Sequence, residues 1–464
     1  MMSGNDERLR EDARSIFMAG LERVDPAAMM RRVIRLDEEG GPGKERLTVR
    51  TELEHASYDL ADFDRILVTG FGKASARMAI ALEEILGKRI SGGVVAVKSG
   101  HVEPLEHIAL VEASHPVPDA SSIAAAKAVL KPWKRDGKGP LNERTLVIVL
   151  VSGGGSAIAC APADGISLAD KAATTRLLLA SGAVIHELNC VRKHLSAIKG
   201  GLLAEAYAPA TVLALMLSDV IGDDLDTIAS GPTVPDGTSF AQALTITRRY
   251  GIHDALPAAV RSRLEAGASG ALPETPKPGA PAFARVRNIL IGTNRMALLA
   301  AEARAKKLGY ETLVFSSRIE GEAREVAKFF FGAGKDIAVS DYPLRKPACL
   351  ISGGETTVTI RGHGRGGRNQ EMALSFLDAL SRAPKDTERM MFLSSATDGN
   401  DGPTDAAGAF ASIGILEDAR SRGLDPAVFL ADNDSYAFFD SVGALLRTGP
   451  TNTNVCDIQI LLVR

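Results

Sequence analysis

Short apolar runs alternate with segments of helical periodicity along most of the chain. Strand-like runs cover residues 65–69, 94–97, 146–151 and 211–217, and helix-like segments near 119–130, 168–181 and 191–206 lie between or beside them. The first strand, a glycine-containing loop and a helix with apolar residues on one face form the opening half of a parallel α/β unit. The alternation predicts a doubly wound, largely parallel sheet.

The pattern changes after residue 234 and resumes near residue 286. Residues 267–281 hold four prolines and several glycines, so we expect a linker or an exposed loop there. Strand-like runs then follow at 286–291, 312–315, 349–352 and 458–463, with helix-like segments at 295–308 and 321–331, and an amphipathic helix is expected at the start, over 9–24. We therefore predict an α/β protein of two domains, 1–240 and 241–464, with a ligand-binding cleft between them.

Composition and charge narrow the class of protein. The 464 residues are 45% hydrophobic and 24% charged, which is typical of a soluble globular chain. A net charge of -3 favours neither nucleic-acid nor membrane-surface binding, since both need a basic excess. Four widely spaced cysteines without a CxxC pair indicate buried thiols in a reducing compartment. No apolar leader or span-length run is present, so we expect a cytoplasmic protein.

The loop after the first strand carries a lysine in a position suited to binding an anion. Gly70, Gly72 and Lys73 begin the loop, but Ser75 replaces the third glycine of a dinucleotide fingerprint, and Ala74 breaks a phosphate-loop pattern. What remains is a lysine at the first turn of a helix and at the carboxyl end of a strand. The alternative is a solvated loop lysine.

Two further loops also follow strands of the first half. Residues 151–156 (VSGGGS) form a second glycine loop, whose backbone N–H groups suit a phosphate; a tight turn without ligand is the alternative. Residues 218–226 (SDVIGDDLD) offer carboxylates for magnesium, and Asp219, at the strand end, is the best functional candidate. Arg192, Ser196 and Lys199 are predicted to share one cationic helix face.

The stretch 362–371 (GHGRGGRNQE) joins a strand-like to a helix-like segment. Many glycines indicate sharp turns or a close approach, and Arg365 and Arg368 precede a helix start that would attract a phosphate or carboxylate. A mobile basic hairpin is the alternative. Residues 395–408 look like a calcium loop at first, but Pro403 and Ala409 occupy positions that such a loop reserves for glycine and glutamate.

Eight motifs in order resemble those of the class II glycerate kinase family, whose C-terminal part is the MOFRL domain. They are GFGKAS, VSGGGSA, VRKHLSAIKGG, SDVIGDDLDTIASGPT, SGGETTV, GRGGRNQE, ATDGNDGPTDAAG and GPTNTNV, and they run from residue 66 to the end. The resemblance implies a Rossmann-like domain over 1–240 and a smaller α/β domain over 241–464 that contains the MOFRL region, 346–460. It also implies an active site between the domains that transfers the γ-phosphoryl group of ATP to the 2-hydroxyl of D-glycerate, with Mg²⁺.

The resemblance implies that Lys73 and Arg368 are the catalytic pair. By position and carboxylate chemistry alone, Asp219 is the first choice for the general base and Glu371 the second. The substrate carboxylate needs a cation, which Arg365 or Lys199 could supply. Further binding candidates are Gly72, Ser152, Gly153, Gly154, Gly155, Ser156, Glu355, Asn369, Glu371 and Asp398, and metal candidates are Asp219 and Asp223.

Two other functions compete with a kinase. A hydroxypyruvate reductase is a label carried by relatives of this family, but neither glycine loop completes the nicotinamide fingerprint and no ribose-binding acid is in place. A non-catalytic protein that binds nucleotide or sugar acids is the second alternative. The expected partner is a small-molecule substrate, and a homodimer is a further expectation for which the sequence carries no direct signal.

Overall fold

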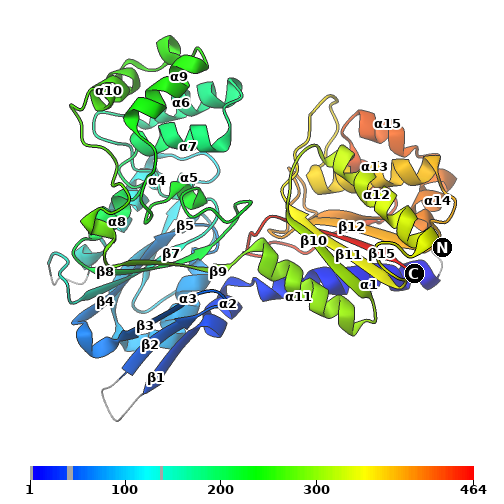
Figure 1. The fold of residues 1–464 in the computed structure, drawn as a ribbon, viewed down its shortest axis with the longest axis horizontal. Helices are drawn as coiled ribbons and strands as arrows, with labels where there is room; N and C mark the ends of the chain where they lie inside the picture. Colours follow the sequence, from blue (N-terminus) through cyan, green and yellow to red (C-terminus); the bar gives the residue numbers. More distant parts are fainter. Residues whose placement is uncertain (1–3, 39–44, 136–138) are drawn as a thin grey trace. The chain divides into compact units, whose positions relative to one another are not determined.

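The computed structural model describes residues 4–38, 45–135 and 139–464, which form two compact units (Figure 1). The large unit comprises Pro26–Ser218 and Asp223–Ile291, and the small unit comprises Met1–Asp25, Asp219–Gly222 and Gly292–Arg464. The predicted boundary at residue 240 does not coincide with this division. Residues 241–291 pack in the large unit, while the opening helix packs in the small one.

Six strands form the central sheet of the large unit, in the order β6-β5-β4-β7-β8-β9. They are β4 (Arg65–Phe71), β5 (Ile90–Lys98), β6 (Ala109–Ala113), β7 (Thr145–Val151), β8 (Thr211–Leu217) and β9 (Val286–Gly292). β4 pairs in parallel with β5 and β7, β5 with β6, and β7 with β8. Counted from β4, the order is 3-2-1-4-5-6, the order of doubly wound dinucleotide-binding sheets, and its progression reverses between β4 and β7.

Burial on both faces explains the apolar runs in this sheet. Every residue of β4 and of β7 is buried, as parallel strands covered on both sides require. Flanking helices are α2 (Pro26–Val33), α3 (Ser75–Leu86), α4 (Ala120–Leu130) and α8 (Leu202–Tyr207). An antiparallel sheet of β1 (Ile34–Glu38), β2 (Glu45–Arg50) and β3 (His55–Asp59) shares the core of the main sheet.

A helical part of the large unit has a core of its own. It is built by α6 (Leu168–Ala180), α7 (Ile185–His194), α9 (Phe240–Arg249) and α10 (Ala258–Ala268). The short helix α5 (Gly155–Ile158) follows β7. The predicted helix over 191–206 is wrong, because Gly200 and Gly201 adopt positive φ angles that end helical structure. Residues 269–280 are irregular, as predicted, but they pack inside this unit, where the Thr275 hydroxyl bonds Asp236.

The small unit is built on a mixed sheet in the order β10-β11-β15-β12-β13-β14. Its strands are β10 (Glu311–Ile319), β11 (Ala348–Gly354), β12 (Met390–Ala396), β13 (Gly408–Ser412), β14 (Leu445–Leu446) and β15 (Asp457–Val463). The last strand lies between β11 and β12 and is antiparallel to both, so it belongs to this unit. The helices are α1 (Gly4–Arg23), α11 (Asn294–Lys307), α12 (Ala323–Ser340), α13 (Arg368–Arg382), α14 (Ile413–Ser421), α15 (Pro426–Ala431) and α16 (Ser435–Ser441).

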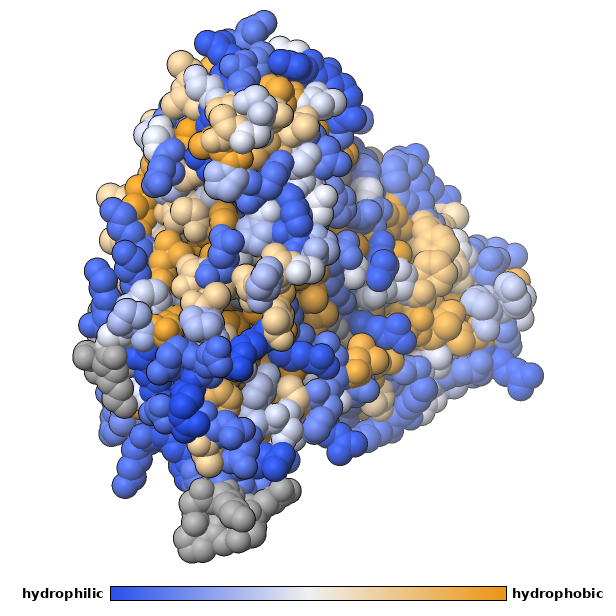
Figure 2. Space-filling view, turned by 60° about the vertical axis from the view of Figure 1, so that its left-hand side comes forward, coloured by the Kyte–Doolittle hydropathy of each residue, from blue (hydrophilic) through white to orange (hydrophobic). Residues whose placement is uncertain are grey.

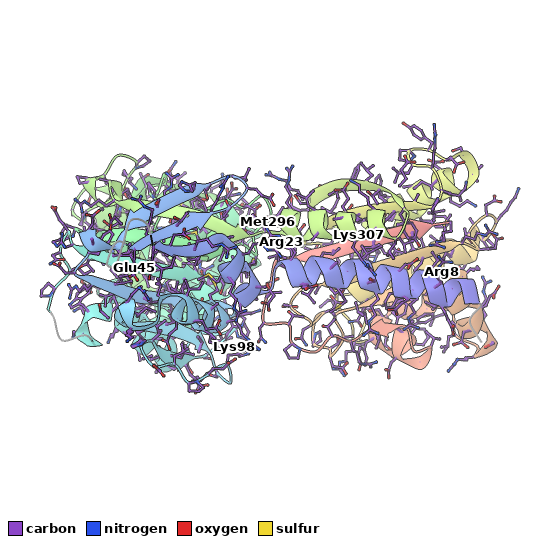
Figure 3. The ribbon with its side chains drawn as sticks, turned by 90° about the horizontal axis from the view of Figure 1, so that it is seen from below. Arg8, Arg23, Glu45, Lys98, Met296 and Lys307 are labelled. Carbon is purple, nitrogen blue, oxygen red and sulfur yellow. The ribbon has the colours of Figure 1, made fainter. Side chains whose placement is uncertain are left out.

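The first helix, α1, packs against elements from the last part of the chain. From Arg8 to Arg23, α1 runs along α11 and against the sheet strands β12 and β15 (Figure 3). The Ser412 hydroxyl donates to Asp6 at 2.9 Å, and the Thr453 hydroxyl donates to the Val24 carbonyl at 2.7 Å. These contacts between distant parts of the sequence place α1 in the small unit.

Hydrophilic side chains cover most of the visible face of the large unit, with smaller apolar areas between them (Figure 2). Exposed large apolar residues include Leu179, Val184 and Ile185, around the connection from α6 to α7. Scattered apolar residues are normal on a protein surface. Among the helices that the structure describes, none is both long enough and apolar enough to cross a membrane.

Candidate active site

The two glycine loops of the large unit lie side by side at the carboxyl ends of β4 and β7. The Lys73 amide donates to the Gly153 carbonyl at 2.9 Å, and the Ala74 amide donates to the Ser152 hydroxyl at 3.0 Å. Because the strand order reverses between β4 and β7, this is the switch point at which open α/β sheets bind ligands. Lys73 and the loop 152–156, predicted separately, are thus brought together.

Packing within the protein accounts for the glycines of these loops. A Cβ atom on Gly72 would lie 2.1 Å from the Ser152 hydroxyl oxygen, where the backbone also has φ +139°. Gly154 has φ +76°, and its Cβ would lie 2.8 Å from His115 Nε2. A Cβ on Gly155 would lie 2.7 Å from the Phe71 ring. Other protein groups therefore lie so close to these glycines that a larger residue would not fit there.

His115 is a residue of this site that the sequence reasoning missed. It follows β6 by two residues, and its ring lies beside Gly154. Burial, followed by the positive charges of Lys73 and Lys98, lowers its pKa to about 4. The imidazole is therefore neutral at pH 7, and the site around Lys73 is electropositive. The strand before it, β6, was not predicted from the sequence, so no local signal pointed to His115.

Lys199 ties three predicted motifs together. Its Nζ lies 2.5 Å from the Ser156 hydroxyl, 3.2 Å from the Ser230 hydroxyl and 3.2 Å from the Ala229 carbonyl. The side chain is buried. The prediction that Arg192, Ser196 and Lys199 share one helix face is wrong, because α7 ends at His194. Tertiary contacts, not helical spacing, position Lys199.

The aspartates after β8 divide between the two units. Asp219 belongs to the small unit, where its carbonyl accepts a hydrogen bond from the Cys456 thiol at 3.3 Å, while Asp223 belongs to the large unit. Across the described residues, no three His, Cys, Asp or Glu side chains gather closely enough to hold a metal ion.

Arg368 forms the centre of a charged cluster in the small unit. Its Nε and Nη2 donate to the two carboxylate oxygens of Asp457 at 2.6 and 2.9 Å, and its Nη1 lies 2.8 Å from a Glu355 oxygen. Burial opposes the charged form of Arg368, but the hydrogen bonds to Asp457 and the negative charges of Asp457, Glu355 and Asp401 together outweigh it and raise the pKa of Arg368. Burial, with the charges of Asp457, Asp219 and Asp398, raises the pKa of Glu355. The predicted residues Arg368, Glu355, Asp219 and Asp398 are therefore neighbours.

The glycine-rich stretch before α13 is packed against other loops. A Cβ on Gly362 or Gly364 would collide with Asp432 or Asp434, and one on Gly367 would collide with Asp401. The Asp401 carboxylate accepts the Asn369 and Gln370 amides at 3.1 and 2.8 Å, so it occupies the N-terminus of α13. The anion that the helix start was predicted to attract is, for these two amides, supplied by the protein itself.

Three other predicted residues of this stretch have internal partners. Arg365 donates to the Pro403 carbonyl at 3.0 and 2.8 Å and lies over the Tyr436 ring. Asn369 is buried and contacts Asp401 and Ser394. Glu371 is buried, with one carboxylate oxygen bonded by Arg324 and the other by Asn433. These contacts give Arg365, Asn369 and Glu371 structural roles, and their predicted binding roles stay predictions.

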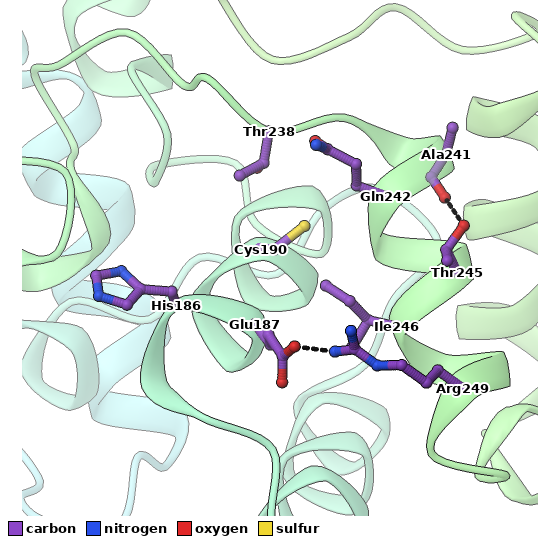
Figure 4. Close-up of a pocket in the computed structure, with 9 residues that line it drawn as sticks. All are labelled: His186, Glu187, Cys190, Thr238, Ala241, Gln242, Thr245, Ile246 and Arg249. Atoms are coloured by element: carbon purple, nitrogen blue, oxygen red, sulfur yellow. Dashed lines mark hydrogen bonds and ion pairs between the residues drawn. The ribbon is translucent and has the colours of Figure 1, made fainter.

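A separate hollow lies between α7 and α9 in the large unit (Figure 4). Its volume is about 450 Å³, and Cys190 points into it between the two helices. Glu187 and Arg249 form an ion pair at its edge. None of the predicted site residues lines this hollow, so we do not include it in the candidate site.

Asp457 and Asp401 are the other functional candidates that sequence reasoning missed. Asp457 follows the motif GPTNTNV, and Asp401 was considered only as part of a calcium loop. Both are fully buried and both contact the first residues of α13. A buried carboxylate that requires a partner was the available signal, but burial is not visible in one sequence.

Comparisons with known proteins agree with this geometry. Residues 12–265 match the family described as "Domain of unknown function (DUF4147)", and residues 348–457 match the MOFRL family. The chain is 43% identical over 403 residues to D-glycerate 2-kinase of Thermotoga maritima, covering 87% of this chain and 91% of that protein. It is also 43% identical over 401 residues to a putative hydroxypyruvate reductase of Agrobacterium vitis, covering 86% and 87%.

A solved structure resembles the whole chain. The crystal structure of glycerate kinase from Thermotoga maritima matches with a TM-score of 0.84 and 39% identity, covering 99% of this chain and 100% of that one. Similar sequence and similar fold extend over both units. The chain therefore belongs to the glycerate kinase family, in which a DUF4147 region is joined to a MOFRL region.

Proposed function

We propose that this protein is a glycerate 2-kinase, which transfers the γ-phosphoryl group of ATP to the 2-hydroxyl of D-glycerate and yields 2-phosphoglycerate and ADP. The observation that carries the proposal is Lys73 beside a second glycine loop at the switch point of a 3-2-1-4-5-6 sheet. Kinase relatives that cover nearly the whole chain support it. The Rossmann-like description of the large unit rests on the same strand order.

Phosphoryl transfer requires mainly alignment of the two reactants and neutralisation of charge on the moving group. In this proposal Lys73 supplies a cation from the large unit, and the loop 152–156 offers backbone amides to the phosphates. Neutral His115 adds no competing positive charge and has a ring nitrogen for hydrogen bonding. Arg368 supplies the second cation, held in one orientation by Asp457.

Asp219 remains our choice for the base that accepts the proton of the 2-hydroxyl group. Glu371 is less suited, because Arg324 and Asn433 occupy both of its oxygens. When bound, Mg²⁺ would neutralise charge on the ATP phosphates. Such an ion usually takes one or two protein carboxylates together with oxygens of the nucleotide phosphates, and Asp219 is the candidate carboxylate.

A single assay pair tests the function. Purified protein is incubated with ATP, Mg²⁺ and D-glycerate, and the product is read with enzymes that distinguish 2- from 3-phosphoglycerate. In parallel, NADH oxidation is followed with hydroxypyruvate. We expect 2-phosphoglycerate and ADP in equal amounts and no NADH oxidation. Product at the 3-position, or NADH oxidation without ADP, would refute the assignment.

The reductase alternative is weaker on chemical grounds. A relative carries that description, but the first glycine loop ends in Ser75 rather than the third glycine of the nicotinamide fingerprint. The homodimer stays a prediction, and sedimentation velocity of the purified chain would test it.

A further inference from the structure

The left-handed turn 229–231, in the connection that follows β8, has a backbone that is rare for residues other than glycine. Ala229 has φ 50° and ψ 21°, Ser230 has φ 63°, and Gly231 has φ 62°. Only the third residue is glycine, so the first two carry steric strain between the Cβ atom and the backbone. Strain of this kind persists only where the surroundings fix it, and it is concentrated at functional sites. Neighbouring residues must therefore hold this turn in place.

Residues 199–201 supply contacts that hold the turn. Lys199 Nζ donates to the Ala229 carbonyl and to the Ser230 hydroxyl, both at 3.2 Å. The backbone amides of the two glycines that follow Lys199 donate to the Ser230 and Gly231 carbonyls, at 3.0 and 2.8 Å. Each residue of the turn thus accepts a hydrogen bond from this segment, and Lys199 is the member that contributes its side chain.

The same turn packs under the second glycine loop. A Cβ atom on Gly155 would lie 3.4 Å from the Ala229 Cβ, which is van der Waals contact. The Ser156 hydroxyl lies 3.4 Å from the Ser230 hydroxyl and 2.5 Å from Lys199 Nζ. A change in the shape of the turn would therefore shift the end of the loop 152–156.

No N–H group of the Lys199 side chain is left for a ligand. The Ser230 hydroxyl donates to the Asn189 side-chain oxygen at 3.0 Å, so its own oxygen accepts from Lys199, and the Ala229 carbonyl can only accept. These two bonds take two hydrogens. The third hydrogen of an ammonium group goes to Ser156, whereas a neutral amine accepts from Ser156 instead. In either state a contact with the substrate carboxylate would break one of these bonds.

We propose that Lys199 is a positioning residue, which locks the left-handed turn 229–231 against the second glycine loop and so keeps the loop 152–156 in the shape that receives the nucleotide phosphates. The inference rests on the proposed function, because that function assigns the phosphates to this loop. It leaves the substrate carboxylate to a different cation.

A pair of buried-cation variants separates positioning from general stability. Lys199→Met is compared with Arg65→Met, which removes a buried cation at the other end of β4, where Arg65 Nε donates to the Thr145 hydroxyl at 2.9 Å. Both variants should melt below wild type. By calorimetry on the folded proteins, Lys199→Met should weaken ADP binding by about tenfold or more, while Arg65→Met stays within about twofold of wild type. The affinity of Lys199→Met for D-glycerate should also stay within about twofold of wild type.

A rescue variant tests whether the lysine acts through the turn. Glycine adopts a positive φ angle without strain, so Ala229→Gly should let the turn keep its shape without the lysine. In the Lys199→Met chain it should recover about threefold or more of the lost ADP affinity, and in wild type it should change that affinity by less than about twofold. If Lys199→Met does not fold, Ser230→Ala removes one acceptor of the lysine and takes its place, with an expected loss of about threefold.

Four results would overturn the positioning role. They are unchanged ADP affinity in Lys199→Met, an equal loss of ADP affinity in Arg65→Met, a loss for D-glycerate as large as that for ADP, and no recovery on adding Ala229→Gly. Failure of wild type to bind ADP would overturn it as well.

The kinase assay is read separately from these affinities. If the ADP affinities change as expected but wild type forms no 2-phosphoglycerate, the positioning role stands and the kinase function is refuted. If wild type forms 2-phosphoglycerate and Lys199→Met binds ADP normally, the function stands and the positioning role is refuted.

Discussion

The pair of Arg368 and Asp457 can be dissected with a double-mutant cycle of Arg368→Ala, Asp457→Asn and the combined variant. Arg368→Ala leaves the fully buried Asp457 carboxylate without the two hydrogen bonds that now satisfy it, and leaves Glu355 without its partner at 2.8 Å. Replacing Asp457 by Asn in the same chain removes the stranded charge. The cycle therefore separates the need to balance Asp457 from any direct role of Arg368.

The structure sets the expected magnitude. Removing one partner of a buried ion pair costs about 3–5 kcal/mol. The Arg368 side chain is 30% exposed, whereas Asp457 is 0% exposed, so water screens part of the interaction, and we expect about 2–4 kcal/mol for Arg368→Ala. The combined variant should recover roughly 1–3 kcal/mol of that loss. At about 2–4 °C per kcal/mol, these differences are measurable in a unit of this size.

Urea denaturation followed by circular dichroism gives the stabilities, and formation of 2-phosphoglycerate gives the activities. We expect Arg368→Ala to lower kcat by about 100-fold or more, and the combined variant to remain equally inactive although its stability recovers. Arg361→Ala replaces an exposed arginine just before the stretch 362–371; it is the matched control and should behave as wild type.

Two results would refute this reasoning. If Arg368→Ala unfolds at the urea concentration of wild type, the pair with Asp457 does not stabilise the small unit. If the combined variant regains activity together with stability, Arg368 serves only to neutralise Asp457 and does not act on the phosphoryl group.

Three further predictions concern the large unit. Lys73→Ala should lower kcat by about 100-fold or more at nearly unchanged stability. The control Lys88→Ala, at the surface, should keep the kcat of wild type. Equal kcat values for the two variants would remove Lys73 from the mechanism. Gly154→Ala should lower the free energy of unfolding, measured in urea, more than Gly182→Ala does. Both glycines have positive φ angles, and an alanine there costs roughly 1–2 kcal/mol. Only the Cβ atom at position 154 would also meet a neighbour, His115 Nε2 at 2.8 Å. The pKa of His115 is about 4 when folded and about 6.5 when unfolded, so the stability it contributes is full above pH 6.5 and is lost as the pH falls toward 4. His115→Gln should flatten that part of a stability profile measured by urea titration, and an unchanged slope would contradict the assignment.

Regular elements could be predicted wherever the local pattern matches the final environment. The run 146–151 is apolar at every position and becomes β7, buried throughout, because a parallel strand covered on both faces needs such a run. The helix predicted over 191–206 failed for a local reason, since two glycines with positive φ separate α7 from α8. The compact units differ from the predicted division at residue 240 for a tertiary reason: residues 241–291 pack in the large unit, and the opening helix packs against elements near the other end of the chain.

The sequence by itself determined the alternation of strands and helices, the two glycine loops, and the candidates Lys73 and Arg368, because periodicity, glycine content and residue chemistry are local properties. Only the tertiary structure decided which groups meet. Ser156, Lys199 and Ser230 come together from separate loops. Asp457 reaches Arg368 from the last strand, 89 residues further along the chain. Such contacts depend on strand order and on burial, which create partners between positions that no local pattern connects.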